Sequence, residues 1–255
     1  MSLMTVRAEG KRWIQCLEAR PRARMRLFCF SFAGGGAGVF RRWPRYLARS
    51  IEVHAIQLPG RENRFGEPCA QSMDEVVAAV MGEWEALSDV PAAFFGHSLG
   101  ALTAYEVAAA VERSGLGEPC HLIVSGRRAA HQNRTGNFHN LPEDALIGEL
   151  IRLNGTSPQI FADREMRDLF LPMLRSDYRI LETYRHAQRG PLDLPIAACS
   201  GADDSEVSPA EMLAWRELTR GLFQYLPFPG DHFYLNPHVQ SLVEAVSTLL
   251  SRKTN

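Results

Sequence analysis

Residues 96–100 read GHSLG and stand between a short apolar run, AAFF (92–95), and a long alanine-rich segment. A GxSxG pattern that joins a strand to a helix is typical of a nucleophile elbow, in which a sharp turn exposes the serine at the tip of the strand. Gly96 and Gly100 permit that turn, and the following helix directs its positive end toward the serine. We therefore predict that Ser98 is a nucleophile rather than part of an ordinary tight turn.

A serine hydroxyl needs a neighbouring base to take its proton, and His232 fits that role best among the eight histidines. The motif FPGDHFYLNP (228–237) places His232 in a loop between the last expected strand and the last expected helix. That loop lies at the same edge of the sheet as Ser98. The other histidines fall inside expected strands, in the elbow itself or in helical segments, so we predict His232 as the base.

A carboxylate must orient the base and stabilise its protonated form. The run IAACSG (196–201) is followed by Asp203, Asp204 and Glu206 in a loop before a helix. We predict Asp204 as this acid, with Asp203 as the competing candidate. The resulting chain order of serine, aspartate and histidine is the order found in α/β-hydrolases.

A glycine-rich stretch, FCFSFAGGGAGVF (28–40), follows another apolar run and raises the question of what it binds. It does not match the dinucleotide pattern GxGxxG, because Val39 stands where the last glycine would fall, and a P-loop lysine is also missing. In the hydrolase fold the corresponding loop supplies one backbone NH group to the oxyanion hole, and the residue after the nucleophile supplies the other. We predict that Ala33 and Leu99 have these roles; a simple tight turn is the alternative.

These candidates need a scaffold, and the apolar pattern along the chain predicts one. Helix-length segments alternate with strand-length runs, which favours an α/β fold with a mostly parallel central sheet and helices on both faces, that is, an α/β-hydrolase fold. The expected strands are WIQCL (13–17), MRLFCFSF (25–32), IEVHAIQL (51–58), AAFF (92–95), HLIVSG (121–126), IAACSG (196–201) and FQYLPF (223–228).

Residues 127–190 interrupt this alternation, because they contain no strand-like run and show two helical patterns instead. We expect a helical lid over 127–190, inserted into a hydrolase core formed by residues 1–126 and 191–255. The alternative is a pair of ordinary crossover helices that lie on the sheet.

Composition excludes several other classes of protein. The charges are balanced, with 28 basic and 29 acidic residues, and no aromatic-basic stripe suggests nucleic-acid binding. The five cysteines include no CxxC pair, which argues against a disulfide framework or a zinc knuckle. No run approaches the length of a membrane span, and no secretory signal is evident. We expect a cytoplasmic monomer without cofactor or metal.

Several longer motifs occur in order along nearly the whole chain, and with them the sequence resembles the type II thioesterases, the stand-alone editing hydrolases that accompany polyketide synthases and nonribosomal peptide synthetases. The resemblance implies hydrolysis of acyl thioesters on the phosphopantetheine arm of an acyl or peptidyl carrier protein, under a flexible lid. The motifs are FAGGGAGVFRRW (32–43), QLPGRENRFGEP (57–68), GHSLG (96–100), LRSDYRILETY (174–184), GADD (201–204) and PGDHFYL (229–235).

Two residues depart from the family pattern: Phe32 stands where a histidine is common, and Leu99 where methionine is commoner. Neither departure removes a catalytic group, because Ala33 and Leu99 act through their backbones. Arg61 and Asp177 we expect to be ion-paired scaffold residues. A medium-chain fatty acyl thioesterase, or a general carboxylesterase of the same fold, is the alternative function, and a non-catalytic receptor is disfavoured because nucleophile, base and acid are all present.

Overall fold

Seven strands form one sheet in the computed structural model, which describes residues 12–153 and 158–251. Their order across the sheet is β1-β3-β2-β4-β5-β6-β7; β1 pairs antiparallel with β3, and all other neighbours are parallel. The expected α/β-hydrolase fold and its seven strands are thus confirmed. The strands are β1 (Ile14–Cys16), β2 (Met25–Phe30), β3 (Ile51–Ile56), β4 (Ala92–His97), β5 (Pro119–Ser125), β6 (Ile196–Gly201) and β7 (Phe223–Phe228).

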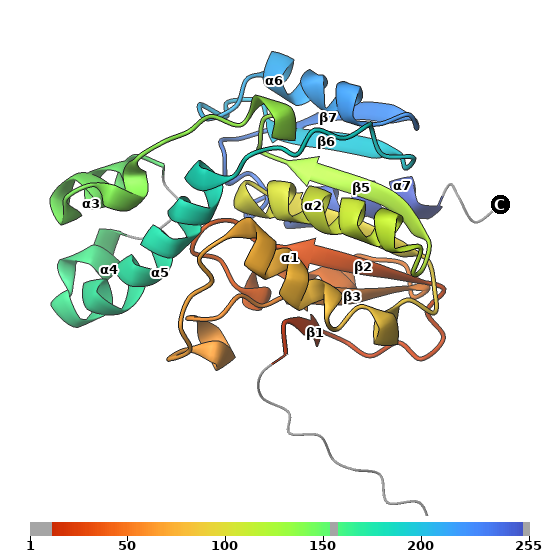
Figure 1. Cartoon of the computed structure of the whole chain (residues 1–255), viewed down its shortest axis with the longest axis horizontal. Coiled ribbons are helices and arrows are strands. Elements are labelled where there is room, and N and C mark those ends of the chain that lie inside the picture. The colour runs from red at the N-terminus through yellow and green to blue at the C-terminus, as the bar shows by residue number, and fades with distance from the viewer. Residues whose placement is uncertain (1–11, 154–157, 252–255) are drawn as a thin grey trace, which may run out of the picture.

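Helices cover both faces of the sheet (Figure 1), which explains why the central strands are buried along almost their whole length. Helices α1, α2 and α6 pack on one face, and α7 packs on the other. No helix within the described residues is long and apolar enough to span a membrane. The helices are α1 (Met73–Met81), α2 (Leu99–Ser114), α3 (Glu143–Arg152), α4 (Pro158–Ala162), α5 (Arg164–Thr183), α6 (Pro209–Leu213) and α7 (Val239–Ser251).

Serine caps define where two of the helices begin. The side chain of Ser72 accepts a hydrogen bond from the Glu75 amide at 3.2 Å and so starts α1. Ser208 forms a reciprocal capping box with Glu211 at the start of α6. The second cap matters for the site, because it fixes the end of the loop that follows β6.

The described residues between β5 and β6 form helices and no strand. Helices α3, α4 and α5 extend beyond the sheet on the left of Figure 1, and they share a small apolar cluster that is separate from the cores on the two faces of the sheet. The last turns of α5 differ, since Ile180 and Leu181 belong to the core that α2 covers. The apolar pattern did not indicate α4. The division into core and lid stays a prediction, which this separate packing favours.

We expect the lid helices to open more readily than the sheet, because their apolar cluster is smaller than either sheet core. Backbone amides of α3 and of the first half of α5 should exchange with solvent faster than those of β4 and β5. A non-hydrolysable acyl-pantetheine should slow that exchange. Hydrogen exchange read by mass spectrometry, with and without this ligand, measures both effects; protection equal to that of β4 in both states would contradict the lid.

Candidate active site

The backbone of Ser98 is held in an unusual conformation at the junction of β4 and α2. Its φ of 55° and ψ of −115° make it one of two non-glycine residues with positive φ in the described part of the chain. The flanking glycines have no space for a side chain: a Cβ at Gly96 would lie 2.0 Å from the carbonyl oxygen of Gly100, and a Cβ at Gly100 would lie 2.1 Å from that of Phe30. This is the strained turn that a nucleophile elbow requires.

Asp204 and His232 meet through a hydrogen bond of 2.9 Å, from Nδ1 of the histidine to Oδ2 of the carboxylate. The Asp204 side chain is fully buried, and its other oxygen accepts a hydrogen bond from the Glu206 amide at 2.8 Å. Asp203 is exposed instead. Of the two candidate acids, Asp204 is therefore the one that contacts the predicted base. It belongs to the loop after β6, as the sequence indicated.

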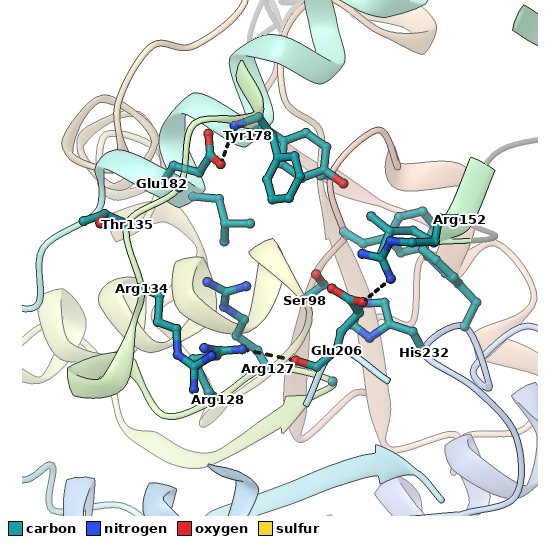
Figure 2. A pocket seen from close by; sticks show the side chains of 18 residues that line it. Ser98, Arg127, Arg128, Arg134, Thr135, Arg152, Tyr178, Glu182, Glu206 and His232 are labelled. Atoms are coloured by element: carbon teal, nitrogen blue, oxygen red, sulfur yellow. Dashed lines mark hydrogen bonds and ion pairs between the residues drawn. The ribbon is translucent and has the colours of Figure 1, made fainter. Parts of the chain in front are cut away.

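Ser98 and His232 line one cavity of about 290 Å³, together with Ala33 from the glycine-rich loop. Figure 2 shows Ser98 beside His232 at one side of this cavity. The aromatic rings of Phe32 and Phe233 also line it and pack edge to face, with their centroids 5.0 Å apart. The structure thus brings the predicted nucleophile and base to one cavity, with the predicted acid bound to the base. Of the two predicted oxyanion residues, Ala33 lines the same cavity, and Leu99 follows Ser98 at the start of α2.

The glycine-rich loop is held by a buried ion pair that reaches across from α5. Arg61 donates two hydrogen bonds of 2.7 Å to the two carboxylate oxygens of Asp177, and both side chains are buried. Asp177 also accepts a hydrogen bond of 2.7 Å from the Gly34 amide, while Arg61 donates to the Gly35 carbonyl at 3.1 Å. The expected ion pair is present, and it additionally fixes the backbone beside Ala33.

The amides of Ala33 and Leu99 have no hydrogen-bond acceptor among the described residues. Their neighbours do have one: Gly34 donates to Asp177, and Ser98 donates to the Ser125 carbonyl at 2.8 Å. Two backbone donors next to a nucleophile, left unused by the protein itself, can stabilise negative charge on a reacting carbonyl oxygen. Their role in an oxyanion hole stays a prediction.

A second histidine, His97, packs against the predicted base His232. His97 is fully buried, its Nδ1 lies 2.8 Å from the Ser125 hydroxyl, and that hydroxyl lies 2.7 Å from the hydroxyl of Tyr234. Burial lowers the pKa of His97 well below its ordinary value, and the nearby charge of His232 adds to this shift. His97 is therefore neutral at neutral pH and packs against His232, with 4.9 Å between the ring centroids. Sequence reasoning missed this network, although His97 and Tyr234 belong to the motifs GHSLG (96–100) and PGDHFYL (229–235), because Ser125, which links them, belongs to neither.

One group among the described residues has the composition of a metal site, and it lies outside the cavity. The ligand atoms of Cys16, Glu52 and His54 lie within 4.8 Å of one another on β1 and β3. The Glu52 carboxylate is already engaged by the Arg20 amide at 2.7 Å and by Arg26 at 3.3 Å. Burial lowers the pKa of His54, and this effect is partly offset by Glu52. The group therefore offers no free carboxylate ligand.

Comparison with known proteins places this arrangement in a family. Residues 25–250 match the thioesterase domain family. The chain is 37% identical to the gramicidin S biosynthesis protein GrsT of Aneurinibacillus migulanus, over 94% of both chains. The structure of the type II thioesterase BorB from the borrelidin biosynthetic cluster is similar, with a TM-score of 0.85 and 37% identity over 95% of this chain and 99% of BorB. The medium-chain S-acyl fatty acid synthase thioesterase of Rattus norvegicus is 33% identical, over 87% of this chain and 86% of that protein. This chain belongs to the thioesterase family.

Proposed function

We propose that this chain is a serine thioesterase that releases acyl groups from the phosphopantetheine arm of acyl or peptidyl carrier proteins, in an editing or release role beside polyketide or nonribosomal peptide synthesis. The observation that carries the proposal is the hydrogen bond between Asp204 and His232 next to the strained turn of Ser98. Similarity to GrsT, a gramicidin S biosynthesis protein, and to BorB, a type II thioesterase of the borrelidin biosynthetic cluster, supports this substrate class.

The first half of the reaction transfers the acyl group to the enzyme. The Ser98 hydroxyl gives its proton to Nε2 of His232 while its oxygen attacks the thioester carbonyl. Negative charge develops on the carbonyl oxygen and is stabilised by the amides of Ala33 and Leu99. The carbon–sulfur bond then breaks, and His232 returns the proton to the sulfur, so that the arm leaves as a free thiol.

The second half releases the acid by the same steps with water as nucleophile. His232 takes a proton from water, and the resulting hydroxide oxygen attacks the acyl-serine carbonyl. The carbon–oxygen bond to Ser98 breaks, and the serine recovers its proton from His232. In both halves Asp204 holds the imidazole in one tautomer and stabilises its protonated form.

A second candidate function has its own support. The similarity to a medium-chain S-acyl fatty acid synthase thioesterase leaves a fatty acyl substrate as the alternative. The two candidates share the triad and differ in the acyl chain and the carrier.

A basic patch gives an acidic carrier protein a place to dock. Arg41, Arg42 and Arg45 follow the glycine-rich loop and are exposed. They have no carboxylate partner in the described part of the chain. Such unpaired surface cations favour association with an acidic partner, mainly through the association rate.

Replacing the acid tests the triad. We expect Asp204→Asn to lower turnover by about 10⁴-fold, because the wrong imidazole tautomer is then favoured. Asp203→Asn, the matched control, should change turnover little, since the Asp203 side chain is exposed. Steady-state hydrolysis of an acyl-pantetheine measures both, with thermal unfolding to verify the fold. The reverse ranking of the two variants would assign the acid role to Asp203.

Changing the carrier of one acyl group tests the substrate class. We expect kcat/KM to be highest for the acyl group on a holo carrier protein, lower on free pantetheine and lowest for the p-nitrophenyl oxygen ester. Contacts remote from the reacting carbon can lower the barrier, so truncation should reduce kcat as well as raise KM. If the oxygen ester were the best substrate, a general carboxylesterase function would replace the proposed one.

A further inference from the structure

Arg127 belongs to the cavity that contains the proposed nucleophile. It follows the end of β5 two residues after Ser125, whose carbonyl accepts the Ser98 amide at 2.8 Å. Arg127 and Ser98 line the same cavity. Three arginines follow β5 along the chain, Arg127, Arg128 and Arg134. In Figure 2 they lie on one side of the cavity, opposite Ser98 and His232.

The other arginines that line the cavity have carboxylate partners. Arg128 and Arg134 reach the carboxylate of Glu211, at 3.4 and 3.0 Å. Arg152 pairs with Glu206 at 3.0 Å, which Figure 2 marks with a dashed line. Each of these three arginines therefore has a carboxylate within ion-pair distance, although Arg128 and Arg134 share the single negative charge of Glu211.

Arg127 differs, because no carboxylate oxygen in the described residues lies within 4.0 Å of its guanidinium. Its NH2 group donates a hydrogen bond to the side-chain oxygen of Asn133, which is neutral. Its Nε is buried and has no hydrogen-bond partner. Among the four arginines that line the cavity, Arg127 is therefore the one without a carboxylate partner in the described part of the chain.

Holding a guanidinium in this way is unfavourable for the folded protein. Burial lowers the pKa of Arg127 to about 10, and the neighbouring positive charge of Arg128 contributes to the same shift. A purely structural arginine would be more stable beside a carboxylate, as its neighbours are. A bound anion would supply the missing negative charge.

We infer that Arg127 forms an anion-binding subsite in this cavity, which takes a carboxylate or phosphate group of the substrate. The inference deepens the proposed thioesterase function and rests on it. The guanidinium fork matches the geometry of both groups. A carboxylate would be carried by the acyl group itself, as in a short dicarboxylic acyl chain, whereas a phosphate would belong to the phosphopantetheine arm. In either case the charged group is held apart from the reacting carbonyl, and Arg127 selects substrates that carry it.

Binding measurements test the subsite without requiring turnover. Thioether analogues of malonyl and butyryl groups, each on pantetheine and on 4′-phosphopantetheine, would be titrated into the full chain carrying Ser98→Ala. We expect at least one added anion to tighten binding by about tenfold, as a charge-assisted hydrogen bond provides. Adding Arg127→Gln should abolish that gain. Loss of the malonyl gain identifies a carboxylate as the ligand, and loss of the phosphate gain identifies the arm.

Arg134→Gln is the matched control, because Arg134 lines the same cavity but is paired with Glu211. It should keep the gain, and Arg127→Lys should keep part of it, since the charge remains without the fork. The inference is overturned if the Ser98→Ala chain binds charged and uncharged analogues within twofold of each other, or if Arg127→Gln leaves the gain intact. Failure of the chain with Ser98 intact to hydrolyse any of the four matching thioesters would count against the proposed function instead.

Discussion

The site depends on how closely three backbone segments approach one another beneath Ser98. At Gly100 the first turn of α2 lies so near the end of β2 that a Cβ would come within 2.1 Å of the Phe30 carbonyl oxygen. At Gly96 the end of β4 is equally close to α2. A larger residue at either position would push β2, β4 and α2 apart, and the positive φ of Ser98 would no longer be enforced. The glycine-rich loop after β2 lies beside the serine for the same reason.

The close approach alone does not hold that loop, and the structure adds a second constraint from far along the chain. Asp177 lies on α5, which belongs to the expected lid, yet it binds the Gly34 amide and the Arg61 guanidinium inside the core. The backbone next to the predicted oxyanion residue Ala33 is thereby bound to α5. A change in the position of α5 would therefore reach the backbone beside Ala33 through one buried carboxylate, which connects the expected lid to the candidate site.

Much of this arrangement could be predicted from the sequence, because short local patterns indicate the elbow and the loops that carry Asp204 and His232. The elbow needs glycines two residues on either side of Ser98, and parallel strands bring the loops of Asp204 and His232 to one edge of the sheet. What escaped prediction depends on contacts between distant residues. The bonds from Asp177 to the glycine loop span 143 residues to Gly34, and α4 is too short to show a periodic pattern. The unpaired state of Arg127 is visible only once the positions of all nearby carboxylates are known.

The central claim is that Ser98 is the nucleophile, and covalent labelling tests it most directly. An alkyl fluorophosphonate reacts with a serine only where a base activates the hydroxyl and an oxyanion site receives the phosphoryl oxygen. Intact mass followed by peptide mapping should reveal one adduct per chain, located on Ser98, and no adduct on Ser98→Ala. An adduct on another residue, or equal labelling of the Ser98→Ala chain, would contradict the account.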